Sequence, residues 1–183
     1  PLWSRGLGDV YKRQLQTSSA SGGLARIQQG TASAASTITI SGLNGDADIK
    51  YVIELQGTIS TNADRWIYVT PNAATGGTYF SSQHRIDAGA TNVAEVYSTL
   101  QGILIGRTVY QQNGTISLQS TLFAQSGYFR QAISSCVFYA TQSANGLSNI
   151  QGTWADSSTN ITSLVINFNG GTFTGRWRLY SPR

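Results

Sequence analysis

Few side chains in this chain of 183 residues are of the types that catalyse reactions or bind metals. It has one histidine, His84, one cysteine, Cys136, and no methionine. A hydrolytic triad needs a base beside a nucleophile, and nothing around His84 resembles the sharp turn that carries a hydrolase nucleophile. A single histidine and a single cysteine also exclude multi-histidine and cysteine-based metal centres. We therefore expect His84 to be an exposed polar residue and Cys136 to be a small buried hydrophobic residue.

Carboxylates are the remaining candidates for chemistry. Two of them meeting in space would suit glycoside hydrolysis, but acidic residues scattered through turns are also what solubility requires. Asn44, Asp46 and Asp48 alternate like the start of a calcium loop. However, Ile49 stands where that loop needs glycine, and Leu55 where it needs a bidentate glutamate. We interpret the segment as a structural turn and expect no catalytic residue, metal or cofactor, and so no enzyme.

Aromatic residues beside polar ones offer a different chemistry, because an aromatic ring stacks on the face of a sugar while polar groups bond its hydroxyls. A region around a glycine-rich loop has this composition, and we expect it to contact a host-surface glycan. Its residues are Trp66, Tyr68, Tyr79, His84 and Arg85. Ordinary core packing is the alternative role for each aromatic residue.

The formal charge of +4 and the pI near 9.4 would suit a nucleic-acid-binding protein. Half of that charge lies in residues 1–14. The segment Asp9 to Gln14 reads DVYKRQ, which resembles the translated transposon end used to prepare sequencing libraries, so we interpret 1–14 as adapter-derived. A basic arm or a signal peptide is the alternative, but the segment has no apolar run. Residues 15–183 carry only +2, so we expect no nucleic-acid partner. The chain has no apolar stretch of about 18 residues, so we expect no membrane insertion.

From residue 36 onward, short runs of β-branched and aromatic residues alternate with clusters of Gly, Asn, Asp and Ser, which is the signature of an all-β protein. The alternation predicts about ten antiparallel strands, and so many strands imply two packed sheets in a jelly-roll-like β-sandwich. We expect strands at 37–41, 51–56, 66–70, 77–82, 103–111, 115–119, 120–124, 128–140, 148–154, 162–168 and 172–180.

Two segments are less clear in the sequence. Residues 91–101 have both a helical spacing and the composition of a strand, and the surrounding strands favour a strand. Residues 15–35 are rich in Ser, Ala, Gly, Gln and Thr, which predicts a flexible polar leader with a short edge strand at 24–27. We expect one sandwich domain over 36–183.

Two motifs resemble a family of tailed-bacteriophage structural proteins. The first is SGLNGD at 41–46 followed by YVI at 51–53, and the second is GTFTGRWRLY at 171–180. In that family such motifs bracket a β-sandwich, and the resemblance spans about 36–180. The matching residues, which we expect to have structural roles, are Leu43, Gly45, Asp46, Tyr51, Phe173, Gly175, Trp177, Leu179 and Tyr180. Trp177 departs from the pattern, because a β-branched residue is commoner there.

The resemblance implies a non-catalytic virion component on a tail fibre, a baseplate or the head surface. It further implies a homo-oligomer, with a trimer favoured, and other virion proteins as partners. The low charge of the chain, 11% of residues, suits surfaces that pack into symmetric assemblies. The alternative is a secreted bacterial carbohydrate-binding module or adhesin domain, which would be extracellular and monomeric.

Overall fold

The fold is seen in a computed structural model of the chain. It describes residues 23–61, 63–74, 76–88, 91–98, 101–108, 113–141 and 144–182. The expectation for residues 1–14, and that for the first part of the polar leader, lie outside these residues.

The described residues form twelve β-strands and one short helix. The elements are β1 (Leu24–Ala35), β2 (Thr37–Ser41), α2 (Gly45–Asp48), β3 (Lys50–Ser60), β4 (Trp66–Pro71), β5 (Tyr79–Asp87), β6 (Thr91–Ser98), β7 (Ile103–Arg107), β8 (Gly114–Phe123), β9 (Arg130–Thr141), β10 (Ala144–Trp154), β11 (Ser163–Asn167) and β12 (Thr172–Pro182). The prediction of an all-β sandwich is confirmed, with twelve strands rather than about ten.

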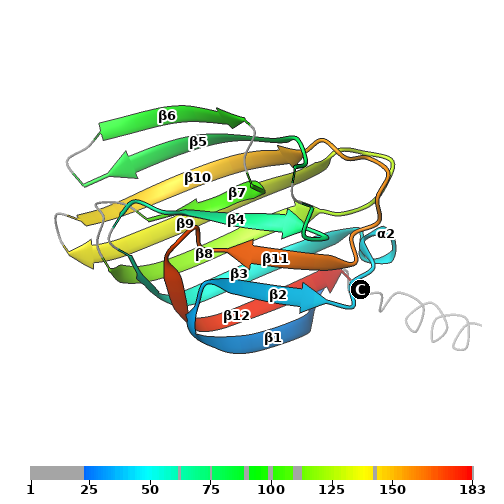
Figure 1. Cartoon of the computed structure of the whole chain (residues 1–183), viewed down its shortest axis with the longest axis horizontal. Coiled ribbons are helices and arrows are strands. Elements are labelled where there is room, and N and C mark those ends of the chain that lie inside the picture. The colour runs from blue at the N-terminus through cyan, green and yellow to red at the C-terminus, as the bar shows by residue number, and fades with distance from the viewer. Residues whose placement is uncertain are drawn as a thin grey trace, which may run out of the picture.

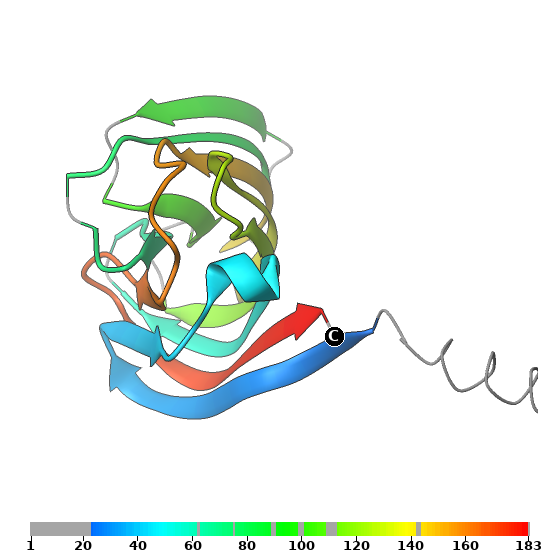
Figure 2. The ribbon, with the colours of Figure 1, turned by 90° about the vertical axis from the view of Figure 1, so that its right-hand side faces the viewer.

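The strands make two antiparallel sheets that pack face to face (Figure 1). The larger sheet has the order β1-β12-β3-β8-β9-β10-β5-β6, and the smaller has the order β2-β11-β4-β7. Figure 2 shows the larger sheet curling around the smaller one, so that its outer face is convex across the strands. Among the described residues, no second sheet covers that outer face.

Strict alternation of side chains creates the core. Every second residue of β9, from Arg130 to Phe138, is buried, and the residues between them are exposed. Most of the buried apolar residues form one large cluster between the sheets, in which the rings of Phe168 and Phe173 stack with centroids 5.1 Å apart, and a smaller cluster surrounds Tyr68. Burial of this apolar surface is the main force that holds the two sheets together.

Some predicted strands have different limits in the structure. The short strand expected at 24–27 runs on to Ala35 and pairs with β12, so this part of the predicted leader belongs to the larger sheet. The strands expected at 115–119 and 120–124 are one continuous strand, β8. The segment at 91–101, where strand and helix competed, forms a strand over Thr91–Ser98.

The SGLNGD motif at 41–46 forms the corner between the two sheets. Asn44 caps α2, its side chain accepting a hydrogen bond from the Ala47 amide at 3.3 Å. Asp46 accepts from the Ser126 amide at 2.7 Å, and the hydroxyl of the fully buried Tyr51 donates to Asp48 at 2.7 Å. These carboxylates therefore hold the turn together, as the sequence predicted for this segment.

Leu43 and Gly45 complete this corner. Leu43 is buried in the main core cluster. Gly45 lies so close to the loop that follows β8 that an added Cβ would stand 2.9 Å from the Ala124 carbonyl oxygen. This close packing accounts for a small residue at position 45.

The second motif forms β12, the strand between β1 and β3. Phe173 and Leu179 are buried in the core, and the half-buried Trp177 packs against it. Gly175 pairs with Gly57, and a Cβ on Gly175 would stand 2.4 Å from the Gln56 carbonyl oxygen. The Tyr180 hydroxyl donates to Glu54 at 3.1 Å. Both motifs therefore occupy positions that hold the fold together.

Candidate binding surface

The outer face of five adjacent strands of the larger sheet carries no formal charge. We call it the neutral face. It consists of the odd-numbered residues of 115–123, 131–139 and 147–153, and the even-numbered residues of 80–86 and 92–98. None of these residues is Asp, Glu, Lys or Arg. The outward charged side chains of this sheet, such as Lys50, Glu54, Arg176 and Arg178, lie instead on β3 and β12.

The neutral face also exposes many large apolar side chains. The most exposed is Val96, at 83%, and Ile133 follows at 56%. The others are Phe80, Ile86, Phe123, Val137, Tyr139 and Leu147. A wide uncharged surface with apolar side chains is typical of a surface that is covered by a ligand or a protein partner.

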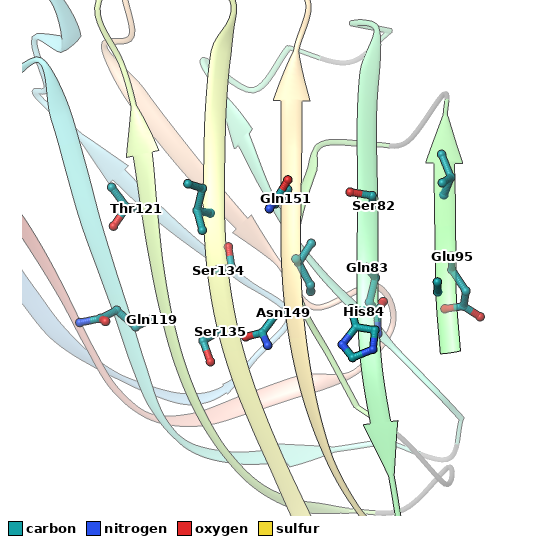
Figure 3. A pocket seen from close by; sticks show the side chains of 14 residues that line it. Ser82, Gln83, His84, Glu95, Gln119, Thr121, Ser134, Ser135, Asn149 and Gln151 are labelled. Carbon is teal, nitrogen blue, oxygen red and sulfur yellow. The ribbon is translucent and has the colours of Figure 1, made fainter. Parts of the chain in front are cut away.

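A hollow of about 580 Å³ crosses the middle of the neutral face. Two rows of paired residues line it (Figure 3). One row runs Ala94–His84–Asn149–Ser135–Gln119, and the next runs Val96–Ser82–Gln151–Ile133–Thr121. Most of these side chains are amides and hydroxyls, so the floor of the hollow is rich in uncharged hydrogen-bonding groups. Glu95, which is ion-paired with Arg107, also lines the hollow on β6 (Figure 3).

Apolar side chains lie on both sides of the hollow. The register places Phe80 and Phe123 in the row beyond one side, and Ile86, Leu147 and Val137 in the row beyond the other. The rim with Ile86, Leu147 and Val137 is therefore more apolar than the floor. The other rim mixes Phe80 and Phe123 with polar residues and borders a second hollow of about 330 Å³ on the same face. The hollow runs across the strands, so the neutral face is concave along the strand direction. Across the strands the same face is convex, because the larger sheet curls around the smaller one.

A cluster of charged residues lies on the opposite, inward side of the same edge strands. The Arg107 guanidinium of β7 donates to Glu95 of β6 at 2.7 Å and to Asp64 at 3.3 Å. Arg85 of β5 lies 2.8 Å from Asp87. The arginine side chains are about 11–12% exposed, so most of their charge is balanced inside the sandwich by these carboxylates.

Burial shifts the pKa of two groups in this cluster and beside it. The Tyr97 hydroxyl donates to Glu95 and is partly buried, and burial together with that bond raises the pKa of Tyr97 to about 12. Burial likewise raises the pKa of Asp87, while Arg85 and Arg107 oppose the rise. Every carboxylate of the cluster has an arginine partner, so the geometry suits a structural network rather than a general acid and base.

A third arginine, Arg130, is buried at the opposite end of the sandwich. It is fully buried, and its guanidinium donates to the carbonyl oxygens of Tyr128 at 2.9 Å, Asp156 at 2.7 Å and Thr159. It also lies 5.9 Å from the centre of the Trp154 ring. Arg130 therefore holds the loop before β9 and the loop after β10 against the first residue of β9.

The five residues expected to contact a glycan do not form one exposed site. Tyr68 and Tyr79 are buried in the core, and Arg85 belongs to the ion cluster. The half-buried Trp66 packs against Tyr97, with ring centroids 5.3 Å apart. His84 is the one of the five that lies on the neutral face. Tyr79 packs in the main core cluster. Trp66 and Tyr68 lie on the face of β4 opposite to Ile67 and Val69 and pack in a second, smaller apolar cluster.

Sequence reasoning did not identify most residues of the neutral face. They come from five strands that are brought together by register, and their chemistry is that of ordinary surface amides and hydroxyls. One signal for them was present in the sequence, namely that the outward positions of each of these strands lack charge.

Two classes of site are absent from the described part of the chain. No group of three or more His, Cys, Asp and Glu residues in it lies close enough to hold a metal ion. No helix in the same ranges is long and apolar enough to cross a bilayer.

Comparison with known proteins gives no family assignment. The chain matches no protein-family model, no curated protein and no solved structure. The functional argument therefore rests on the residues themselves.

Proposed function

We propose that this chain is a non-catalytic structural protein of a tailed-phage virion, displayed on the tail or the head surface. There it assembles with copies of itself and with other virion proteins. The observation that carries the assembly role is the neutral face, which is uncharged across five strands and exposes Val96 and Ile133 to solvent. Such a surface promotes association with other molecules, so we expect it to be covered in the assembled protein rather than exposed on a free monomer.

The virion part of the proposal rests on the two sequence motifs. Their residues pack the corner at α2 and the strand β12, which are positions where a structural family would keep its pattern. A virion protein also needs stability without cofactors, and a β-sandwich with one buried, unpaired cysteine suits that need.

The genes that flank this one provide the first test. Portal, tape-measure or terminase genes beside it are the expected result. A cluster for polysaccharide degradation or secretion would overturn the virion assignment. Light scattering of the purified full chain provides the second test, for which we expect a stable assembly.

Carbohydrate binding is a second candidate function, and the floor of the hollow favours it. Asn149, Gln119 and Gln151 present amides that bond sugar hydroxyls, and the hollow crosses five strands. This function predicts a monomer that binds glycans on an array and loses binding in the double variant Gln119→Ala, Asn149→Ala. Ser117→Ala, which lies on the same face outside the hollow, is its matched control.

A further inference from the structure

We propose that the neutral face is the interface between two copies of this chain, which pack face to face about a two-fold axis with their strands crossing at nearly 90°. The inference rests on the proposed function and specifies the surface and the symmetry of its self-assembly. Charge, area and shape each support it.

The charge of the neutral face favours a second copy as its occupant. In a two-fold interface each surface patch meets itself. A patch with a net charge would repel its own copy, whereas an uncharged patch meets a second uncharged patch without that cost. The cores of protein interfaces are depleted of charge in the same way.

The area of the neutral face is sufficient for a stable dimer. Five strands spaced by about 4.8 Å, each with about eight residues at about 3.3 Å, cover about 600 Å², which is at the lower end of the range for stable interfaces, about 600–1,000 Å² on each partner. A standard interface buries about 800 Å² on each partner. Charged residues of β3 and β12 border this area, as they do at the rim of an interface.

The shape of the neutral face determines how the two copies meet. It is convex across the strands and concave along them, which is the shape of a saddle. A saddle fits its own copy when that copy is turned over and rotated by 90°, because the convex direction of one then lies in the concave direction of the other. Two sheets with strands at right angles are also a known way of packing sheets.

This geometry brings apolar side chains together. The rims of one copy, which carry Phe80 and Leu147, lie against the outer strands β6 and β8 of the other, which carry Val96 and Phe123. The polar floor of the hollow lies at the centre of this interface, where Asn149 and Gln151 of the two copies face each other across the two-fold axis.

The test is the mass of the full chain in solution for two matched variants. Ile133→Arg adds one positive charge to the hollow of each copy, and therefore two charges to each dimer interface. Ile27→Arg makes the same substitution at an exposed position of β1, outside the neutral face. We expect wild type and Ile27→Arg to be dimers or even-numbered assemblies, and Ile133→Arg to dissociate at least about 100-fold more readily.

Folding is verified separately, by circular dichroism and by the burial of the Cys136 thiol, and Val96→Glu serves as a second disrupting variant. A trimer, or an assembly that Ile133→Arg and Val96→Glu leave intact, would overturn the proposed interface and leave the virion function standing. A wild-type monomer that binds glycans through Asn149 would overturn both.

Discussion

Arg107 of the smaller sheet and Glu95 of the larger sheet are joined by a hydrogen-bonded ion pair of 2.7 Å. The pair links β7 to β6, which is the free edge of the larger sheet. β6 pairs with one other strand, β5, and its outward side chains are exposed. The charged contact inside the sandwich is therefore a principal tie between this edge strand and the smaller sheet.

We expect Glu95→Gln to destabilise the fold by about 1–3 kcal/mol, because it leaves the nearly buried Arg107 guanidinium without its closest carboxylate. The measurement is urea unfolding, with hydrogen exchange to localise the effect to β5 and β6. Glu54→Gln is the control, since Glu54 and Arg178 form a more exposed pair 3.6 Å apart and the new amide keeps an oxygen that can accept from Tyr180, and its cost is expected below about 1 kcal/mol. Equal effects of the two substitutions would contradict this account.

Gly175 is a residue of the second phage-like motif, and we expect Gly175→Ala to cost about 2–4 kcal/mol. An added Cβ would stand 2.4 Å from the Gln56 carbonyl oxygen and 2.8 Å from the Phe173 ring, so β3 and β12 would have to separate. Thermal unfolding measures the loss. Arg176→Ala, at the next and exposed position of β12, is the control and is expected to change stability by less than about 0.5 kcal/mol.

The strands were largely predictable from the sequence, and the errors at β8 and β5 have a common physical cause, which is that polar residues occupy buried positions. β8 was expected as two strands because Ser120 stands at a position where an apolar residue would continue the pattern. Ser120 is nevertheless buried, and it accepts a hydrogen bond from Ser134 at 2.8 Å. The inward residues of β5 after Tyr79 are Ser81, Gln83, Arg85 and Asp87, so the apolar signal ended too early there as well.

The candidate site was less predictable than the fold. Its two lining rows combine residues that are far apart in the sequence, such as Val96 and Thr121, and they meet only through the register of four strand pairs. The aromatic residues that drew attention in the sequence, Tyr68 and Tyr79, are core residues. Residue type alone did not distinguish a ring that contacts a ligand from a ring that fills the sandwich.

Cys136 is the single cysteine of the chain, so its thiol reports unfolding at one site. It is buried between the sheets, and burial raises its pKa to about 11. We expect Ellman's reagent at pH 8 to modify the native chain at least about 10³-fold more slowly than the urea-unfolded chain. Thr31→Cys in a Cys136→Ala background, which exposes a thiol on β1, is the fast-reacting control. Immediate reaction of native Cys136 would mean that the sandwich opens readily.

The stability of the chain is expected to fall in acid partly through Asp156. Its carboxylate accepts hydrogen bonds from the amides of Ser158 at 2.8 Å and Thr159 at 2.9 Å, and from the Thr159 hydroxyl at 2.7 Å. These bonds favour the ionised form and lower the pKa of Asp156 to about 2, from an ordinary value of 3.8. Because the pKa is lower in the folded state, this contribution is complete above about pH 5 and is lost progressively as the pH falls through 3.8 to 2.

Asp156→Asn removes that titration while keeping an oxygen that accepts from the turn. We expect the variant to be about 0.5–1.5 kcal/mol less stable at pH 7, because it loses charged hydrogen bonds. Its difference from wild type should shrink steadily between pH 4 and pH 2. Urea unfolding at a series of pH values measures both effects, with Ser157→Ala, an exposed residue of the same loop, as the control. A difference that stays constant down to pH 2 would mean that these bonds do not favour the ionised carboxylate.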